Sequence, residues 1–153
     1  MDKQKAKELF ESCDKNGSGY VDRTEFVHMM LYFFELKEDD EQISNLLDDI
    51  FTMVDGKGLF NRKDGKLNFN EFYKIVSLIP NYYVAPIRSL GYVLFNLVDK
   101  NSSGDVSKKE IKSYFDKIGV GMKSKELNKF IEKLDRDNDS VISFDEFMKL
   151  FTD

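Results

Sequence analysis

The sequence predicts an all-α protein built from helix–loop–helix units. Two observations predict this fold: a hydrophobic block that occurs four times in 153 residues, and a helical spacing of apolar residues beside the blocks. Each block is an apolar pair, two spacers, one apolar residue and an Asp, and the segment after it closes at a Glu followed by an apolar residue. The four segments run from Asp14 to Glu25, Asp55 to Glu71, Asp99 to Glu110 and Asp135 to Glu146.

The first unit has one helix leading into Asp14 and another starting near Glu25. In the second helix, apolar residues recur at steps of three and four, which predicts one apolar face. The residues on that face are Phe26, Met29, Met30, Phe33 and Phe34. We expect Met29 and Met30 to lie in the core, and a role in a groove for a partner is the alternative.

The second unit repeats the helical spacing, but its loop is irregular. The apolar residues before this loop are Ile43, Leu46, Leu47, Ile50, Phe51 and Val54. The segment from Asp55 to Glu71 is seventeen residues counted inclusively, whereas the other three segments have twelve. The insertion is basic, and it carries Leu59 and Phe60 as a possible contact for a partner.

An apolar and aromatic connector precedes the third unit. Pro80 cannot continue the preceding helix, and Pro86 suits the first turn of the next one. We expect Tyr82, Tyr83 and Val84 to pack between the two halves of the chain; a surface that contacts a partner is the alternative. The helix after Pro86 is apolar nearly all round, which is typical of a helix buried on more than one side.

The third and fourth units have regular segments that also carry helix-starting signals. Ser107 and Ser143 stand where an N-cap belongs, each with a Glu three residues later, and Asp22 has the same place in the first unit. This spacing predicts capping boxes, in which the cap side chain and the Glu exchange hydrogen bonds with each other's backbone.

The three twelve-residue segments resemble the calcium-binding loops of the EF-hand family, and the resemblance covers nearly the whole chain. That loop has side-chain oxygens at positions 1, 3, 5 and 9, a backbone carbonyl at 7, Gly at 6 and a bidentate Glu at 12. Calcium is a hard cation that takes six to eight oxygens, and alternate residues of a tight loop can point toward it. The resemblance implies the ligands Asp14, Asn16, Ser18, Tyr20, Asp22 and Glu25 in loop 1; Asp99, Asn101, Ser103, Asp105, Ser107 and Glu110 in loop 3; and Asp135, Asp137, Asp139, Val141, Ser143 and Glu146 in loop 4.

The three regular loops differ in acidity. Four side-chain carboxylates are candidate ligands in loop 4, three in loop 1 and two in loop 3, where Asp105 contributes its carbonyl. Loop 4 departs from the family pattern because Ser140 replaces the Gly of position 6. That position needs a positive φ, which costs a residue other than Gly roughly 1 kcal/mol. We expect loop 4 to bind calcium nevertheless.

The second loop matches the family only in its second half. Asp64, Gly65, Asn68 and Glu71 fit positions 5, 6, 9 and 12, but Phe60 and Arg62 would fall at positions 1 and 3 and cannot ligate calcium. We therefore expect about three bound calcium ions and an empty second loop; recruitment of Asp55 across the insertion is the alternative.

The resemblance also implies how the units pair. Paired loops of the family meet in a short antiparallel strand contact, which here would join Val21 to Leu67 and Val106 to Ile142. It implies an N-terminal EF-hand lobe at 1–80, a connector at 81–86 and a C-terminal EF-hand lobe at 87–153. A loop that binds no ion can still hold its partner loop in shape.

The function that we expect is calcium binding, in a calmodulin-like sensor that exposes apolar surface and binds a protein or amphipathic-helix target. One alternative is a calcium buffer that opens little. Another is a constitutive light-chain-like subunit, clamped on a helix of a larger protein.

Composition excludes several other classes of function. The net charge of −5 argues against nucleic acid as a partner, and we expect no membrane span because no apolar run approaches about 20 residues. We expect no enzyme, because His28 is the only histidine and no catalytic or zinc-binding spacing occurs. Cys13 is the only cysteine, which suits a cytoplasmic location, and we expect it in the core.

Overall fold

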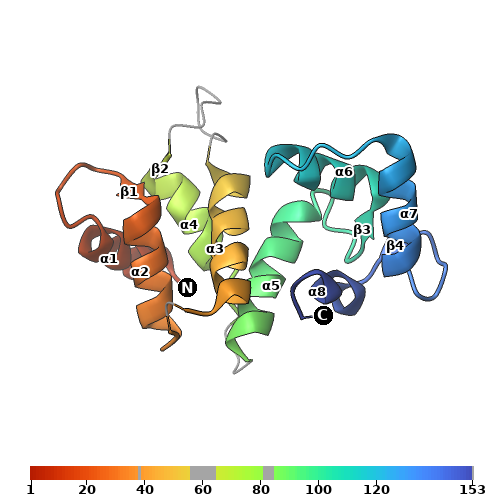
Figure 1. The fold of residues 1–153 in the computed structure, drawn as a ribbon. Coiled ribbons are helices and arrows are strands. Elements are labelled where there is room, and N and C mark those ends of the chain that lie inside the picture. Colours follow the sequence, from red (N-terminus) through yellow and green to blue (C-terminus); the bar gives the residue numbers. More distant parts are fainter. Residues whose placement is uncertain (38, 56–64, 81–84, 153) are drawn as a thin grey trace.

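The computed structural model describes residues 1–37, 39–55, 65–80 and 85–152, which form eight helices and four two-residue strands (Figure 1). The predicted all-α class is confirmed. In chain order the elements are α1 Lys3–Cys13, β1 Val21–Asp22, α2 Arg23–Phe33, α3 Glu41–Val54, β2 Lys66–Leu67, α4 Phe69–Ser77, α5 Pro86–Val98, β3 Val106–Ser107, α6 Lys108–Lys117, α7 Ser124–Leu134, β4 Val141–Ile142 and α8 Phe144–Thr152.

The strands join the loops in two antiparallel pairs, β1 with β2 and β3 with β4. Val21 lies opposite Leu67, and Val106 lies opposite Ile142. Both pairs are those that we expected. All four side chains are fully buried, so each strand pair also closes one end of a hydrophobic core.

Aromatic contacts bring the helices of the N-terminal half together. The Phe10 ring of α1 lies 5.6 Å from that of Phe69 and 5.3 Å from that of Phe72, which ties α1 to α4. Phe26 of α2 and Phe51 of α3 have ring centroids 5.6 Å apart. These pairs adopt tilted or edge-to-face arrangements, which aromatic rings prefer.

One residue of the predicted apolar face of α2 lies elsewhere. Phe26, Met29 and Met30 are buried as expected, but Phe33 is 44% exposed. Phe33 is the last residue of α2, and its ring packs edge-to-face against that of Phe34, which lies partly buried against the core. Met30 therefore lies in the core, as expected, and Met29 is buried too, although it also lines a groove described below.

The C-terminal half is assembled around α5 and α8. Phe95 of α5 contacts both Phe144 and Phe147 at centroid distances of 5.5 and 5.4 Å. Gly91 lets α8 approach α5 closely, because a Cβ at this position would lie 2.1 Å from Sδ of Met148.

The two halves contact each other through α3 and α5, which lie side by side in the middle of the molecule (Figure 1). This contact explains why α5 is buried on more than one side, as predicted, although Tyr92 is 37% exposed. The expected packing of Tyr82, Tyr83 and Val84 lies outside the described residues. Among the helices that the structure describes, none combines the length and apolarity needed to cross a bilayer.

Candidate metal centre

Each regular loop starts with an Asp that directly follows a helix and accepts a backbone hydrogen bond from position 6. The Asp14 carboxylate accepts from the Gly19 N–H at 2.7 Å. The equivalent distances are 2.9 Å from Gly104 to Asp99 and 2.9 Å from Ser140 to Asp135. This bond folds the loop back on its first residue and directs the position-1 carboxylate inward.

The middle of each loop brings further oxygens to the same place. In loop 1 the Ser18 hydroxyl lies 3.1 Å from Oδ1 of Asp14 and 3.0 Å from the carbonyl oxygen of Tyr20. In loop 3 the Ser103 hydroxyl lies 2.7 Å from the carbonyl oxygen of Asp105. The candidate ligands of positions 1, 5 and 7 thus already converge in loops 1 and 3.

The closing Glu connects each loop to the helix after it. In loop 3, Oε1 of Glu110 accepts from the Ser107 N–H at 3.0 Å, and the Ser107 hydroxyl accepts from the Glu110 N–H at 3.2 Å. The same exchange joins Ser143 to Glu146 and Asp22 to Glu25, so the three predicted capping boxes are confirmed.

The second oxygen of the closing Glu reaches the start of the loop in the C-terminal half. Oε2 of Glu110 accepts from the Lys100 N–H at 2.6 Å, and Oε2 of Glu146 accepts from the Arg136 N–H at 2.6 Å. Position 12 is therefore linked to both ends of the loop, so a displacement of this carboxylate is transmitted to the exit helix.

Loop 4 gathers the most negative charge. One carboxylate oxygen from each of its four acidic candidates lies within 4.8 Å of the others, in Asp135, Asp137, Asp139 and Glu146. Burial opposes ionisation of Asp135, but hydrogen bonds from Ser140 and Asp139 bring its pKa below the ordinary value. Desolvation and a hydrogen bond shared with Asp135 raise the pKa of Asp137. An all-oxygen set that crowds four carboxylates fits a hard divalent cation.

The backbone at position 6 has the expected left-handed conformation in all three loops. The φ angles are +82° at Gly19, +90° at Gly104 and +70° at Ser140. Ser140 therefore carries a conformational strain that the two glycines avoid.

The second loop keeps part of this geometry in spite of its insertion. Asp55 is buried and accepts from the Gly65 N–H at 3.0 Å, so these residues take the places of positions 1 and 6. Asn68 and Glu71 form a capping box at the start of α4. Leu59, Phe60, Arg62 and Asp64 lie outside the described residues.

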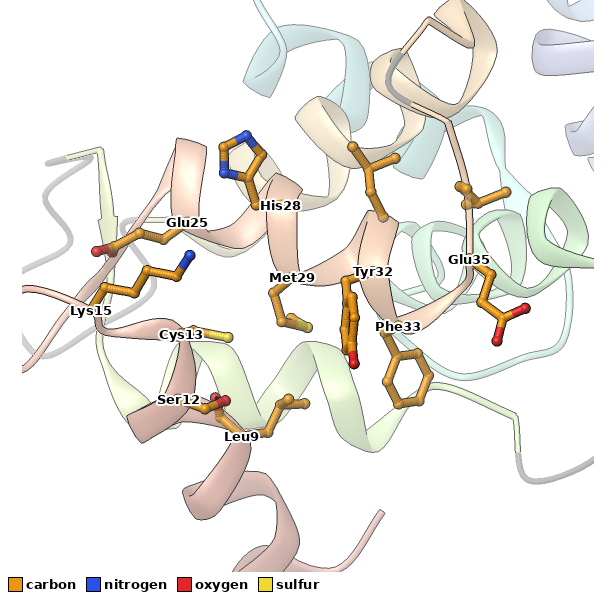
Figure 2. A pocket seen from close by; sticks show the side chains of 12 residues that line it. Leu9, Ser12, Cys13, Lys15, Glu25, His28, Met29, Tyr32, Phe33 and Glu35 are labelled. Carbon is orange, nitrogen blue, oxygen red and sulfur yellow. Dashed lines mark hydrogen bonds between the residues drawn. The ribbon is translucent and has the colours of Figure 1, made fainter.

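A groove of about 980 Å³ lies beside loop 1, between α1 and α2. Figure 2 shows side chains from both helices directed into it. Its apolar lining includes Leu9, Cys13, Met29, Tyr32, Phe33 and Leu36. Tyr32 is 88% exposed at its edge. Met29 is the residue of this groove for which the spacing along α2 indicated such a role, and the adjacent aromatic residues Tyr32 and Phe33 at the end of α2 are a further signal for it.

Cys13 lies at the inner side of this groove. The residue is buried, as expected, and burial raises the pKa of its thiol to about 11. The thiol is therefore protonated at neutral pH and acts as a small apolar group.

The sequence matches a protein family and is similar to several known proteins. The family described as EF-hand domain pair matches residues 3–77 and 88–152. A probable calcium-binding protein, CML11, of Oryza sativa subsp. japonica is 29% identical over 151 residues, covering 95% of this chain and 65% of that protein. Caltractin of Naegleria gruberi is 28% identical over 97% of this chain and 78% of its own length. A troponin C of Blattella germanica is 27% identical over 97% of this chain and 93% of its own length.

Proposed function

Because the chain belongs to the EF-hand family of calcium-binding proteins, we propose that it is a calmodulin-like calcium sensor that binds a protein target when its loops are loaded. The observation that carries the proposal is the groove between α1 and α2, which shares α2 with loop 1.

The proposed ligands are the eighteen oxygen-bearing residues of loops 1, 3 and 4 named in the sequence analysis. Bound calcium would supply positive charge that offsets the mutual repulsion of the carboxylates. We propose three ions and an empty second loop, whose strand β2 supports β1 of loop 1. The division into lobes at 1–80 and 87–153 is part of the same proposal.

The link from ion to groove runs along a single helix. Glu25 stands in the first turn of α2, and the groove residues Met29, Tyr32 and Phe33 follow on the same helix. A change in the position of the Glu25 carboxylate therefore moves one wall of the groove relative to α1. This is the kind of displacement by which a sensor of this family exposes apolar surface.

The groove also indicates the chemistry of the target. Apolar side chains make up most of its lining, and the carboxylate of Glu35 stands at the end away from loop 1, whereas Glu25 and Lys15 lie beside the loop, where Glu25 is a proposed calcium ligand (Figure 2). In a chain with a net charge of −5, this combination favours an amphipathic helix with basic residues beside its apolar face. We propose no catalytic activity, and a cytoplasmic location in keeping with the free thiol of Cys13.

A buffer with little opening is the second candidate, and the contact between α3 and α5 favours it. That contact holds the two halves together and limits how far α3 can move. It does not involve α1, whose separation from α2 would open the groove. The sensor proposal therefore requires movement of α1 relative to α2 while α3 stays in place.

The test is a calcium titration of the metal-free protein in excess magnesium, followed with a dye that fluoresces on apolar surface. We expect a rise with calcium that is lost in Glu25→Gln and kept in Glu132→Gln, a matched change at an exposed position of α7. Calcium uptake without a dye response would contradict the sensor and support the buffer. A strong signal that calcium leaves unchanged would instead indicate a subunit without its partner.

A further inference from the structure

A hydrogen bond between side chains joins the two halves of the molecule. The hydroxyl of Tyr114 on α6 donates to Oδ2 of Asp49 on α3 at 2.5 Å. Tyr114 is 2% exposed, and its ring packs against those of Phe115 and Phe147. The bond therefore lies in a largely apolar interface, where a hydrogen bond to a carboxylate is stronger than at the surface.

Both partners are chemically suited to keep this bond. Burial raises the pKa of Tyr114 well above its ordinary value, so the phenol retains the proton that it donates. Burial also raises the pKa of Asp49, and the Tyr114 hydroxyl counteracts part of that rise. Loss of the hydroxyl would leave a partly buried carboxylate without this donor.

On the C-terminal side, the bond leads directly to loop 3. Tyr114 lies on α6, one turn after Glu110, the candidate position-12 ligand. Glu110 is hydrogen-bonded to the backbone of both Lys100 and Ser107, so its carboxylate sets the position of the first turn of α6. A shift of Glu110 consequently moves the Tyr114 hydroxyl.

On the N-terminal side, the bond leads to loop 1. Asp48, the neighbour of Asp49, accepts from Nη1 of Arg23 at 2.7 Å, and Nη2 of Arg23 donates to Thr52 at 3.2 Å. The guanidinium also lies 4.6 Å from the centre of the Phe51 ring. Arg23 is the first residue of α2 and directly follows Asp22, the position-9 candidate of loop 1.

We propose that the Tyr114–Asp49 hydrogen bond couples the two halves, so that calcium in loops 3 and 4 raises the calcium affinity of loop 1. This inference rests on the proposed function. The coupling is positive because the hydrogen bond is present in the same conformation in which the candidate ligands of loops 1 and 3 converge. Calcium that stabilises this conformation in one loop therefore also stabilises the interface and, through it, the other loop. By linkage, calcium in loop 1 raises the affinity of the C-terminal loops by the same factor.

The test uses a tryptophan reporter in loop 1, because the chain has no tryptophan of its own. Tyr20→Trp keeps the position-7 carbonyl and provides a signal from that loop. Its calcium midpoint is measured with loops 3 and 4 intact and with both disabled by Glu110→Gln and Glu146→Gln. The comparison is repeated in Tyr114→Phe and in the control Tyr92→Phe, which removes a hydroxyl from a partly exposed ring.

We expect disabling loops 3 and 4 to raise the midpoint of the reporter at least about fivefold in the parent and in Tyr92→Phe. In Tyr114→Phe the rise should fall below about twofold, because the interface no longer transmits the change. Equal rises with and without the Tyr114 hydroxyl would overturn the proposal, and so would no rise in the parent.

A second variant and the response of the reporter separate loss of coupling from loss of folding or of calcium binding. If Tyr114→Phe loses helical circular dichroism, Asp49→Ala replaces it, since this change removes the acceptor instead of the donor and carries the same expectation. A reporter that does not respond to calcium at all would refute calcium binding by loop 1 and the coupling together. A reporter that responds but is insensitive to the C-terminal loops would refute the coupling alone.

Discussion

Replacement of Ser140 by glycine isolates the conformational strain in loop 4. Ser140 has a φ of +70°, in the left-handed region that glycine occupies at the same position in loops 1 and 3. Its backbone N–H donates to Asp135 at 2.9 Å, and the substitution leaves that bond in place. Ser140→Gly thus changes the backbone preference and little else at an exposed position.

The magnitude follows from two opposing contributions. The left-handed conformation costs a residue with a Cβ roughly 1–2 kcal/mol, and glycine avoids this cost. Glycine loses about 0.5–1 kcal/mol more conformational entropy on folding. We expect Ser140→Gly to raise the free energy of unfolding by up to about 1.5 kcal/mol, which corresponds to a factor of up to roughly 10 in the equilibrium constant.

Urea denaturation of the parent and the variant, with and without calcium, measures this difference. The reciprocal change Gly104→Ser provides the control, because it introduces a Cβ at a φ of +90° and open space surrounds that position. It should lower stability by a similar amount. A lower free energy of unfolding in Ser140→Gly than in the parent would refute the reasoning. Changes in the free energy of unfolding that have the same sign in both variants would also refute it.

Three other changes test separate parts of the structure. Glu146→Gln should weaken binding in loop 4 at least about tenfold and remove one ion from the stoichiometry measured by calorimetry; an unchanged ion count would contradict the ligand assignment. Gly91→Val places atoms where Sδ of Met148 lies, 2.1 Å from the Cβ position, and should cost about 1–3 kcal/mol in urea denaturation, whereas parental stability would mean that α8 yields easily. Asp49→Asn should raise stability at neutral pH, because burial raises the pKa of Asp49 and the ionised form is disfavoured in the folded state. The parent regains that stability as the pH falls below the ordinary carboxyl range. The urea curves of the parent and of Asp49→Asn should therefore differ at neutral pH and coincide at acid pH. A difference that stays constant with pH would contradict the assignment.

The sequence was a good guide to features that depend on neighbours along the chain. The capping boxes join residues three positions apart, such as Ser107 and Glu110, so their spacing is visible in the sequence. The strand registers follow from the loop positions of Val21 and Leu67 in the family pattern, and the structure confirms them. The ligand set itself stays a prediction, to which the structure adds the convergence of the oxygens.

Periodicity was a poorer guide where helices end. The spacing placed Phe33 on an inward face, but Phe33 and Tyr32 border the groove, while Met30 and Leu31 of the same turn are buried in the core. Periodicity gives the direction of a side chain around the helix axis, whereas exposure depends on whether another element lies there. No pattern within α2 contains that information.

The sequence by itself determined the four helix–loop–helix units, their caps and their strand pairing, because each rests on short-range spacing repeated along the chain. Only the tertiary structure decided how the two halves meet. Tyr114 and Asp49 are 65 residues apart, and neither belongs to a motif. Their contact, like that of Gly91 with Met148, arises from the packing of whole helices, in which each residue's partner depends on the positions of all the others.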